Sequence, residues 1–391
     1  MFSRRLKSGY FILEGLNSFA TVYYFYYFYF FMQTVFGFGN KANLSLAALN
    51  GLVYAVMAWQ GGNFAQRFGY FTALKTGFVI MMGALAVGSQ LHSAVGQVVV
   101  MAVTVVGMCF TWPTLEALVS EGETRAGVQR MVGIYNMTWA GTAAVAYFFG
   151  GAMLEKFGPK SLFYVPVGIQ VTQLGLTLWL ESQARRTVPA SATKADTVTP
   201  DPHPHPAATT KVFLRLAWLA NPFAYIGINT LIAVMPGIAK RLELSTMVAG
   251  FCCSIWCFSR LGAFFVLWRW DGWHYRFRWL LAAYVALVGT FTCILMAPNL
   301  AVLVLAQIIF GCVAGLIYYS SLFYSMDLGD TKGEHGGIHE AAIGLGNFAG
   351  PAVGAASLYF LPQYANSGAL AVSGLLLLGL GGLLAIWYKG T

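Results

Sequence analysis

Long stretches without any charge are the feature that most restricts how this chain can fold. Residues 15–40 and 76–115 contain no Lys, Arg, Asp or Glu. About 20 apolar residues are enough to span the hydrocarbon core of a bilayer. Charged residues make up only 9% of the chain, against about 25% in soluble domains. So few charges cannot cover a globular surface in water, and we therefore expect a polytopic membrane protein.

Polar breaks divide the sequence into twelve apolar segments of helical length. The predicted spans are 9–36, 45–65, 71–93, 96–119, 127–154, 160–181, 212–238, 245–268, 275–297, 300–325, 336–361 and 366–388. We predict an all-α membrane protein with twelve transmembrane helices in two six-helix bundles, residues 1–182 and 212–391. Residues 183–211 join the bundles. This linker is polar and holds five of the thirteen prolines, so we expect it to be solvated and disordered.

The distribution of basic residues predicts the orientation of the chain. Seventeen of the 23 Lys and Arg residues lie on the side that holds the N-terminus, five lie on the opposite side, and Arg260 is inside a span. Cytoplasmic loops of membrane proteins carry an excess of Lys and Arg. We therefore predict that both termini and the linker are cytoplasmic, in a plasma (bacterial inner) membrane. The same bias accounts for the net charge of +9 without a nucleic-acid partner.

The two halves of the sequence repeat at an offset of 204 residues. This shift aligns Asn17 with Asn221, and residues 133–136 with residues 337–340. Internal repeats are typical of secondary transporters, which place the substrate site at the interface between the repeats. The repeat predicts two pseudo-symmetric bundles with a shared site between them.

The loop after the second span carries a recognisable pattern. It reads Gly62-Asn63-Phe64-Ala65-Gln66-Arg67-Phe68-Gly69. This stretch is similar to the Gly-x-x-x-Asp-Arg-x-Gly motif of the major facilitator superfamily, which the chain resembles over essentially its whole length. The resemblance implies a transporter, and it assigns Gly62, Gln66, Arg67 and Gly69 to a loop that latches the halves in the outward-facing state. Gln66 replaces the acid of the motif, so the charge contacts of this latch are reduced.

Two other patterns of that family are absent. The fourth span has no Arg, which many proton-coupled members carry there. Drug–proton antiporters typically have Gly-Pro-x-x-Gly-Gly in the fifth span, where this chain has Ala146-Tyr147-Phe148-Phe149-Gly150-Gly151. The second departure disfavours a multidrug antiporter and favours uptake.

Ionisable residues inside the spans are the candidates for proton coupling, because such groups are costly to expose to lipid. They are Glu14, Glu116, Arg260, His339 and Glu340. Burial disfavours the charged form of a carboxyl group, so a carboxyl in a low-dielectric cavity can exchange protons near neutral pH. We predict that Glu340 couples proton flow to substrate movement, with His339 as neighbour or relay. We also predict that Arg260 pairs with Glu340 or Glu14 in a contact that substrate loading breaks.

Polar and aromatic side chains at helical spacing are the candidates for substrate binding. The family resemblance implies that the first, fifth, seventh and eleventh spans line a central cavity. The candidates on these spans are Asn17, Thr21, Tyr24, Asn136, Trp139, Asn221, Tyr225, Asn229 and Asn347. An alternative for the Asn residues is hydrogen bonding between helices as packing contacts. Most aromatic residues of 21–33 are expected to face lipid or neighbouring helices, with Tyr24 and Phe28 as the exceptions.

Together these features predict a monomeric secondary active transporter. It moves a small polar or amphipathic organic solute by alternating access, with proton-coupled uptake, no metal and no cofactor beyond the coupling proton. Arg260, as one intramembrane cation, leaves a monocarboxylate open, whereas a phosphate or dicarboxylate carrier would usually show several. An exporter or a lipid or drug flippase of the same fold is the alternative, and a receptor that binds without transport is more remote. We find no nucleophile elbow, metal-spaced His/Cys set or phosphate loop that would indicate an enzyme.

Overall fold

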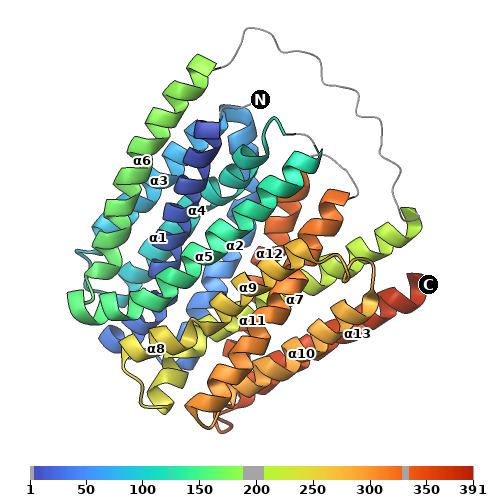
Figure 1. Ribbon diagram of the computed structural model, residues 1–391. Helices are drawn as coiled ribbons and strands as arrows, with labels where there is room; N and C mark the ends of the chain where they lie inside the picture. Colours follow the sequence, from blue (N-terminus) through green and yellow to red (C-terminus); the bar gives the residue numbers. More distant parts are fainter. Residues whose placement is uncertain (1–3, 124, 188–206, 328–333, 391) are drawn as a thin grey trace.

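The protein is almost entirely helical in its computed structural model, which describes residues 4–123, 125–187, 207–327 and 334–390. The helices are shown in Figure 1: α1 (Arg4–Phe36), α2 (Asn40–Phe68), α3 (Tyr70–Gly88), α4 (Ala94–Ser120), α5 (Arg125–Phe157), α6 (Ser161–Thr187), α7 (Ala207–Arg241), α8 (Thr246–Cys253), α9 (Ile255–Arg269), α10 (Phe277–Leu295), α11 (Leu300–Asp327), α12 (Glu334–Phe360) and α13 (Ser367–Gly390). The described ranges contain no strand. Helices satisfy every backbone polar group within the segment, which a lipid environment requires.

Short turns separate consecutive helices, and glycine makes several of them possible. Gly69 joins α2 to α3 with a φ of 90°, and Gly158 lies between α5 and α6 with a φ of 79°. A side chain disfavours positive φ, so glycine is the residue that closes these turns at no steric cost. The turns reverse the direction of the chain between consecutive helices.

The twelve predicted spans are present, with boundaries within six residues of those observed. Eleven stretches of the described chain are long and apolar enough to cross a membrane, and α8 and α9 form one of them, Thr246–Arg269, broken at Ser254. The remaining span, α1, has a lower mean hydropathy than these eleven stretches because it contains six tyrosines. The chain is therefore an integral multi-pass membrane protein.

The helices assemble as two bundles that follow one another in the sequence. In the first, α1 packs on α5 and α6, and α3 packs on α4 and α6; in the second, α7 packs on α11, α12 and α13. Figure 1 shows the blue-to-green helices beside the yellow-to-red ones. The ends of the predicted linker 183–211 are helical, because α6 continues to Thr187 and α7 begins at Ala207. Residues 188–206 lie outside the described chain.

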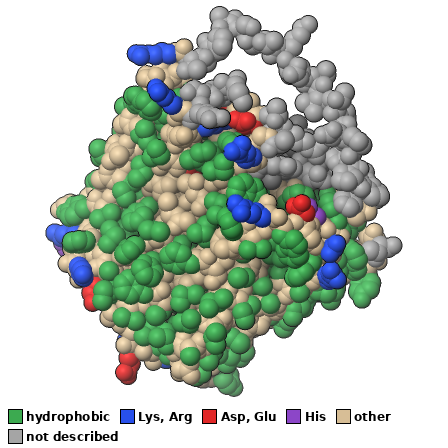
Figure 2. All heavy atoms as spheres, viewed as in Figure 1, with side chains coloured by type: hydrophobic (Ala, Val, Ile, Leu, Met, Phe, Trp, Pro, Cys, Tyr) green, Lys and Arg blue, Asp and Glu red, His purple; other side chains and the backbone are tan. Residues whose placement is uncertain are grey.

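The outer wall of the bundles is apolar. Hydrophobic side chains are spread over the face shown in Figure 2, and charged side chains are few on its lower part. Many large apolar side chains are exposed on the outer surface of the protein. Val95 is 75% exposed and Leu378 is 73% exposed. This exposure is favourable only where lipid, rather than water, surrounds the protein.

The bundles meet along α2 and α12, which run antiparallel and touch through small residues. A Cβ at Gly51 would collide with the backbone of Asn347 and Phe348, and one at Gly344 would lie 2.6 Å from the Cα of Ala55. Small residues of this kind let helix backbones approach closely within a membrane. The α2–α12 contact is therefore a tight seam between the two halves.

A second contact joins the two bundles at the side of the membrane opposite the N-terminus, which we call the far side. There the end of α5 meets the start of α8. A Cβ at Gly151 would collide with the backbone of Thr246. Nearby, the Glu155 carboxylate accepts a hydrogen bond of 2.9 Å from the backbone N–H of Met247. The far-side ends of the two halves are thus held together by backbone-close packing.

Candidate functional site

Four ionisable side chains from both bundles converge on the interface between them. Glu14 of α1 is 0% exposed, Arg260 of α9 is 3% exposed and Glu340 of α12 is 8% exposed. Glu116 of α4 is partly buried, and its carboxyl group lies close enough to Glu14 and Glu340 for electrostatic interaction. These predicted residues face protein and not lipid. The side chain of His339, the remaining candidate, lies outside the described part of the structure.

Each of the two fully buried acids has a hydroxyl partner. Tyr54 of α2 donates a hydrogen bond to Oε2 of Glu340. Ser18, one turn along α1, donates a hydrogen bond of 2.7 Å to Oε1 of Glu14, whereas Oε2 of Glu14 has no partner among the described residues. Tyr135 of α5 is close enough to Glu14 to interact with it electrostatically. The acids, which come from both bundles, therefore lie among hydroxyls contributed by the first bundle.

Arg260 is held by aromatic rings and not by a carboxylate. Its guanidinium carbon lies 4.6 Å from the ring centroid of Trp139 on α5 and 4.8 Å from that of Trp256, one turn earlier on α9. Within the described ranges it makes no hydrogen bond or ion pair, and its buried Nε has no partner. The prediction that Arg260 pairs with Glu340 or Glu14 is therefore wrong for this structure, because both acids face other groups.

The contacts of Arg260 do not offset the cost of burying its charge. A cation–π contact contributes about 0.5–2 kcal/mol. Taking a charged group out of water costs several kcal/mol even after the protein relaxes, unless a counter-charge and hydrogen bonds compensate it. The two rings supply no hydrogen-bond acceptor, and the Nε–H of the guanidinium is buried without a partner in the described chain. Arg260 is thus an undercompensated cation at the bundle interface.

Trp139 connects the two bundles around this cation. Its Nε1 donates a hydrogen bond of 2.9 Å to Oδ1 of Asn136, which fixes the ring on α5. The ring centroid lies 5.9 Å from that of Phe264 on α9 and 5.5 Å from that of Tyr318 on α11. Such edge-to-face contacts are favourable and directional. Trp139 therefore reaches out of its own bundle into the other one.

Further aromatic residues surround the guanidinium. Tyr26 of α1 stacks on Trp256 with ring centroids 6.4 Å apart and planes 21° apart. Tyr225 of α7 has its ring centroid 6.3 Å from that of Tyr318. The hydroxyls of all three tyrosines are near enough to Arg260 for electrostatic interaction. We call Arg260, Tyr26, Trp139, Tyr225, Trp256 and Tyr318 the Arg260 site.

Two predicted asparagines are buried and have side-chain atoms without a hydrogen-bond partner in the described chain. Asn17 on α1 is 0% exposed and neither its Oδ1 nor its Nδ2 has a partner in the described chain. Asn221, the matching residue on α7, is 1% exposed and its Oδ1 is equally without a partner there. Buried polar atoms are normally paired. This pair of amides is available to a polar solute or to water.

Other predicted residues are already committed to the protein. Thr21 donates to the carbonyl of Asn17 on its own helix at 2.7 Å. The ring of Tyr24 contacts Phe163 of α6 at 6.2 Å, within the first bundle. The structure thus places Tyr24 away from the Arg260 site, and its neighbour Tyr26 faces that site instead. The expectation that Tyr24 belongs with the substrate-facing group does not fit this placement.

Asn229 and Asn347 illustrate the packing alternative. Asn229 of α7 donates a hydrogen bond to Oδ1 of Asn347 on α12. Both residues belong to the second bundle, so the bond ties two of its helices together. Interhelical amide hydrogen bonds of this kind stabilise membrane bundles.

The loop assigned to the latch lies at the turn between α2 and α3. Gln66, Arg67 and Gly69 are exposed, and Gly62 lies within the last turns of α2. The Arg67 guanidinium lies 5.2 Å from the ring centroid of Phe68, and no ion pair to it occurs in the described ranges.

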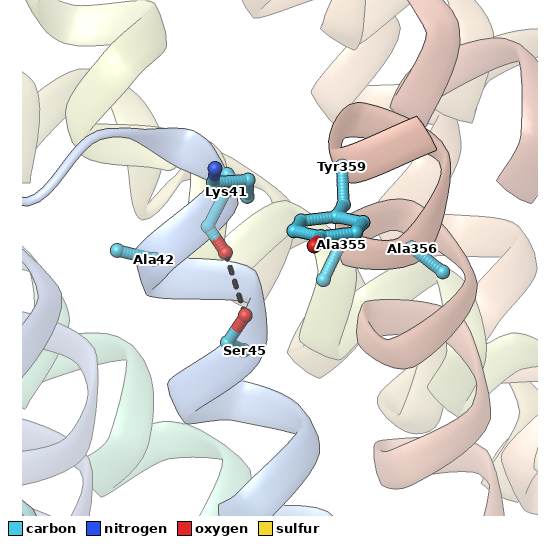
Figure 3. A pocket seen from close by; sticks show the side chains of 6 residues that line it. All are labelled: Lys41, Ala42, Ser45, Ala355, Ala356 and Tyr359. Atoms are coloured by element: carbon cyan, nitrogen blue, oxygen red, sulfur yellow. Dashed lines mark hydrogen bonds between the residues drawn. The ribbon is translucent and has the colours of Figure 1, made fainter. Parts of the chain in front are cut away.

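Two hollows lie away from the buried acids. The pocket in Figure 3, about 260 Å³, lies between the start of α2 and the end of α12, where the Nζ of Lys41 is 5.5 Å from the ring centroid of Tyr359. Its lining is largely exposed, with Ser45 donating to the carbonyl of Lys41 at 3.0 Å. A second hollow, about 590 Å³, is formed by α1, α5 and α6 of the first bundle alone. It is lined by Phe11, Ile12, Gly15, Leu16, Phe19, Thr138, Thr142 and Ile169.

Five residues of the interface were absent from the sequence predictions: Tyr26, Tyr54, Tyr135, Trp256 and Tyr318. Trp256 precedes Arg260 by four residues, a spacing that places both side chains on one helix face and could have indicated the contact. Tyr54 is the one tyrosine of the second predicted span. No sequence signal separates Tyr26, Tyr135 and Tyr318 from the many other aromatic residues.

Comparison with known proteins assigns the fold. The profile of the Major Facilitator Superfamily matches residues 11–351. The crystal structure of the nucleoside transporter NupG has a TM-score of 0.69 and 13% identity, covering 98% of this chain and 99% of that one. An auto-inhibited POT family peptide transporter has a TM-score of 0.73 and 12% identity, covering 98% and 96%. The human organic anion transporter MFSD10 (TETRAN) has a TM-score of 0.65 and 13% identity, covering 98% and 100%. No curated protein sequence matches the chain.

Proposed function

Because the chain belongs to the Major Facilitator Superfamily, we propose that it is a proton-coupled secondary transporter for uptake of a small organic solute. Membership and fold make it a transporter and not an enzyme. The proposal places both termini in the cytoplasm and the far side outside the cell. The observation that carries it is the group of three acids, Glu14, Glu116 and Glu340, at the interface, with Glu340 bonded across that interface to Tyr54.

The acids supply a physical reason for proton coupling. Burial and neighbouring carboxylates both disfavour the charged form of an acid. A buried group of acids therefore takes up or releases protons when its access to water changes, as it does when two bundles rock about a shared site. Intramembrane acids at an interface between repeats are typical of proton relays in transporters.

The bond between Tyr54 and Glu340 links protonation to the α2–α12 seam. A carboxylate accepts a stronger hydrogen bond than a neutral carboxyl group does. Proton uptake by Glu340 would weaken its bond to Tyr54, and loss of the proton would strengthen it. The protonation state of one acid thus biases whether the seam is closed or open, which is the coupling that alternating access requires.

The structural neighbours are described as transporters of nucleosides, peptides and organic anions. These proteins share the fold with this chain, and all handle organic solutes of modest size. This range is compatible with the proposed substrate, a small polar or amphipathic organic molecule.

Reconstitution into proteoliposomes with a pH-sensitive dye inside tests the proposal. Addition of nucleosides, dipeptides and organic acids in turn should produce proton influx with the transported solute. We expect Glu340→Gln to lose accumulation driven by a pH gradient and to retain solute exchange. Glu243→Gln, in the exposed turn between α7 and α8, is the control that should behave as wild type. Undiminished accumulation by Glu340→Gln would exclude this role for Glu340, and extrusion under the reversed gradient would favour an exporter.

A further inference from the structure

Arg260 is a buried charged group at the bundle interface that the proton-coupling proposal does not use. It is 3% exposed, it lies at the bundle interface, and it makes no hydrogen bond or ion pair within the described ranges. None of the three acids forms an ion pair with it in the described chain; Glu340 accepts from Tyr54 and Glu14 accepts from Ser18. A guanidinium has five N–H donors and no acceptor. The site therefore has donors and positive charge without a protein partner.

We propose that the transported solute is an organic monocarboxylate whose carboxylate binds the guanidinium of Arg260. This inference rests on the proposed function, and it names the substrate class of the same interface. A carboxylate matches the planar fork of a guanidinium with two parallel hydrogen bonds. The indoles of Trp139 and Trp256 have one N–H donor each and no acceptor, so they do not occupy the donors of Arg260.

The charges around the site favour one negative charge on the solute. Among the side chains that the structure describes, Arg260 is the one basic group inside the spans at this interface, and three acids lie at the same interface. A dicarboxylate or a phosphate dianion would bring a second charge that no basic side chain of the described interface neutralises. The acids of the interface would repel the second negative charge of such solutes.

The walls of the Arg260 site favour a flat apolar body on the solute. Trp139, Trp256 and Tyr318 present indole and phenol rings around the guanidinium, and Tyr26 stacks on Trp256. Aromatic walls favour planar rings by offset stacking and edge contacts. Aromatic monocarboxylates therefore fit this site better than short aliphatic ones.

The site also requires both bundles. Trp139 belongs to α5 of the first bundle, whereas Arg260 and Trp256 belong to α9 of the second. A carboxylate at Arg260 would therefore contact a group whose aromatic cover changes when the bundles rock. Its binding energy would differ between the two states, as a transported solute requires.

A thermal-shift experiment on the purified full chain in nanodiscs tests the proposal. The probes are benzoate, phenylacetate and indole-3-acetate, each compared with its neutral amide. A ligand that binds the folded state raises the melting temperature by mass action. We expect the acids to raise it and the amides to have no effect, because only the carboxylate supplies the counter-charge.

Three variants assign the effect to the guanidinium. We expect Arg260→Gln to weaken binding of the acids about 10- to 100-fold, since it removes charge-assisted hydrogen bonds. Arg260→Lys keeps the charge and loses the fork, so it should bind the acids with intermediate affinity. Arg269→Gln is the control, because Arg269 lies on the same helix, exposed and over the ring of Phe265. The unliganded melting curve of each variant shows whether it is folded.

Each outcome decides one of the two proposals. Equal stabilisation by acids and amides, no stabilisation by any acid, or unchanged binding to Arg260→Gln would overturn the substrate class. Proton influx with a neutral solute would then still support the transporter proposal. Conversely, carboxylate binding that depends on Arg260 without proton influx in proteoliposomes would retain the substrate class and reject proton coupling.

Discussion

Tyr54, near the middle of α2, donates a hydrogen bond to Glu340, in the second turn of α12. The two residues are 286 positions apart and belong to different bundles. Gly51, three residues from Tyr54 towards the far side, brings the same helices into backbone contact at Asn347. The protonatable acid is therefore attached to the seam that must separate when the transporter changes state.

Replacing Tyr54 tests whether this bond takes part in transport. Tyr54→Phe removes a hydrogen bond to an acid, worth about 1.5–3 kcal/mol. We expect proton-driven uptake to fall about tenfold or more, and the double variant with Glu340→Gln to be no slower than Glu340→Gln alone. Tyr284→Phe is the control, because Tyr284 bonds at 3.1 Å to the carbonyl of Leu376 inside one bundle. Additive effects of the two substitutions would show that the residues act independently.

Closure of the seam depends on the absence of a side chain at Gly51. Gly51→Leu would force the side chain into the backbone of Asn347 and Phe348, so α2 and α12 could not approach. We expect transport to be lost while the protein still elutes as a folded species in gel filtration. Gly83→Leu on α3 is the matched control, since nothing lies within 4 Å of its Cβ position. Wild-type transport by Gly51→Leu would contradict the role of the seam.

The undercompensated charge of Arg260 predicts a stabilising substitution. Arg260→Met keeps an apolar stem of similar length and removes a buried cation without a counter-charge in the described chain. The net gain should be about 1–3 kcal/mol after loss of the ring contacts, seen as a melting temperature a few degrees higher without ligand. Arg241→Met should have the opposite effect, because Arg241 donates to the carbonyls of Leu295 and Ala297. A lower melting temperature for Arg260→Met would mean that the charge is compensated after all.

Outside the bundle interface, the strongest prediction about stability concerns Lys7. Its Nζ donates to the carbonyls of Val119 at 2.8 Å and Glu121 at 2.7 Å, at the end of α4, and lies 3.4 Å from the Glu123 carboxylate. Helix C-termini leave carbonyls unpaired and favour a cation. Lys7→Gln should therefore destabilise the protein by about 1–3 kcal/mol.

The control for Lys7 is a lysine with a more exposed ion pair. Lys75 pairs with Glu181 at 2.7 Å, and its side chain is 30% exposed, against 9% for Lys7. Exposed pairs contribute about 0–1 kcal/mol. Thermal unfolding should thus respond more to Lys7→Gln than to Lys75→Gln, and equal responses would argue against capping of α4.

The fold was predictable because lipid leaves few alternatives. The lengths of the apolar segments predicted the twelve spans, and the excess of Lys and Arg on one side of the membrane predicted one orientation. The break at Ser254 was not predictable, since neither proline nor glycine occupies residues 251–257. The sequence shows the low hydropathy of α1 but not what makes it tolerable, which is that neighbouring helices bury most of its tyrosines.

The candidate site was predictable by residue type and not by pairing. An acid or an arginine inside a span must face protein, and Glu14, Arg260 and Glu340 do so. Which groups meet depends on the rotation of each helix and on contacts between distant segments. For this reason the sequence pointed to Arg260 beside an acid, whereas the structure places it between Trp139 and Trp256.

The tyrosines of α1 have a consequence for how the chain is made. The Tyr23 hydroxyl is 2.7 Å from that of Ser161, 138 residues later, and Tyr27 donates to the carbonyl of Tyr147, 120 residues later. The ribosome delivers α1 first, when neither partner exists, and unpaired hydroxyls are costly in hydrocarbon. We expect α1 to wait at the insertion machinery and to enter the bilayer together with α5 and α6.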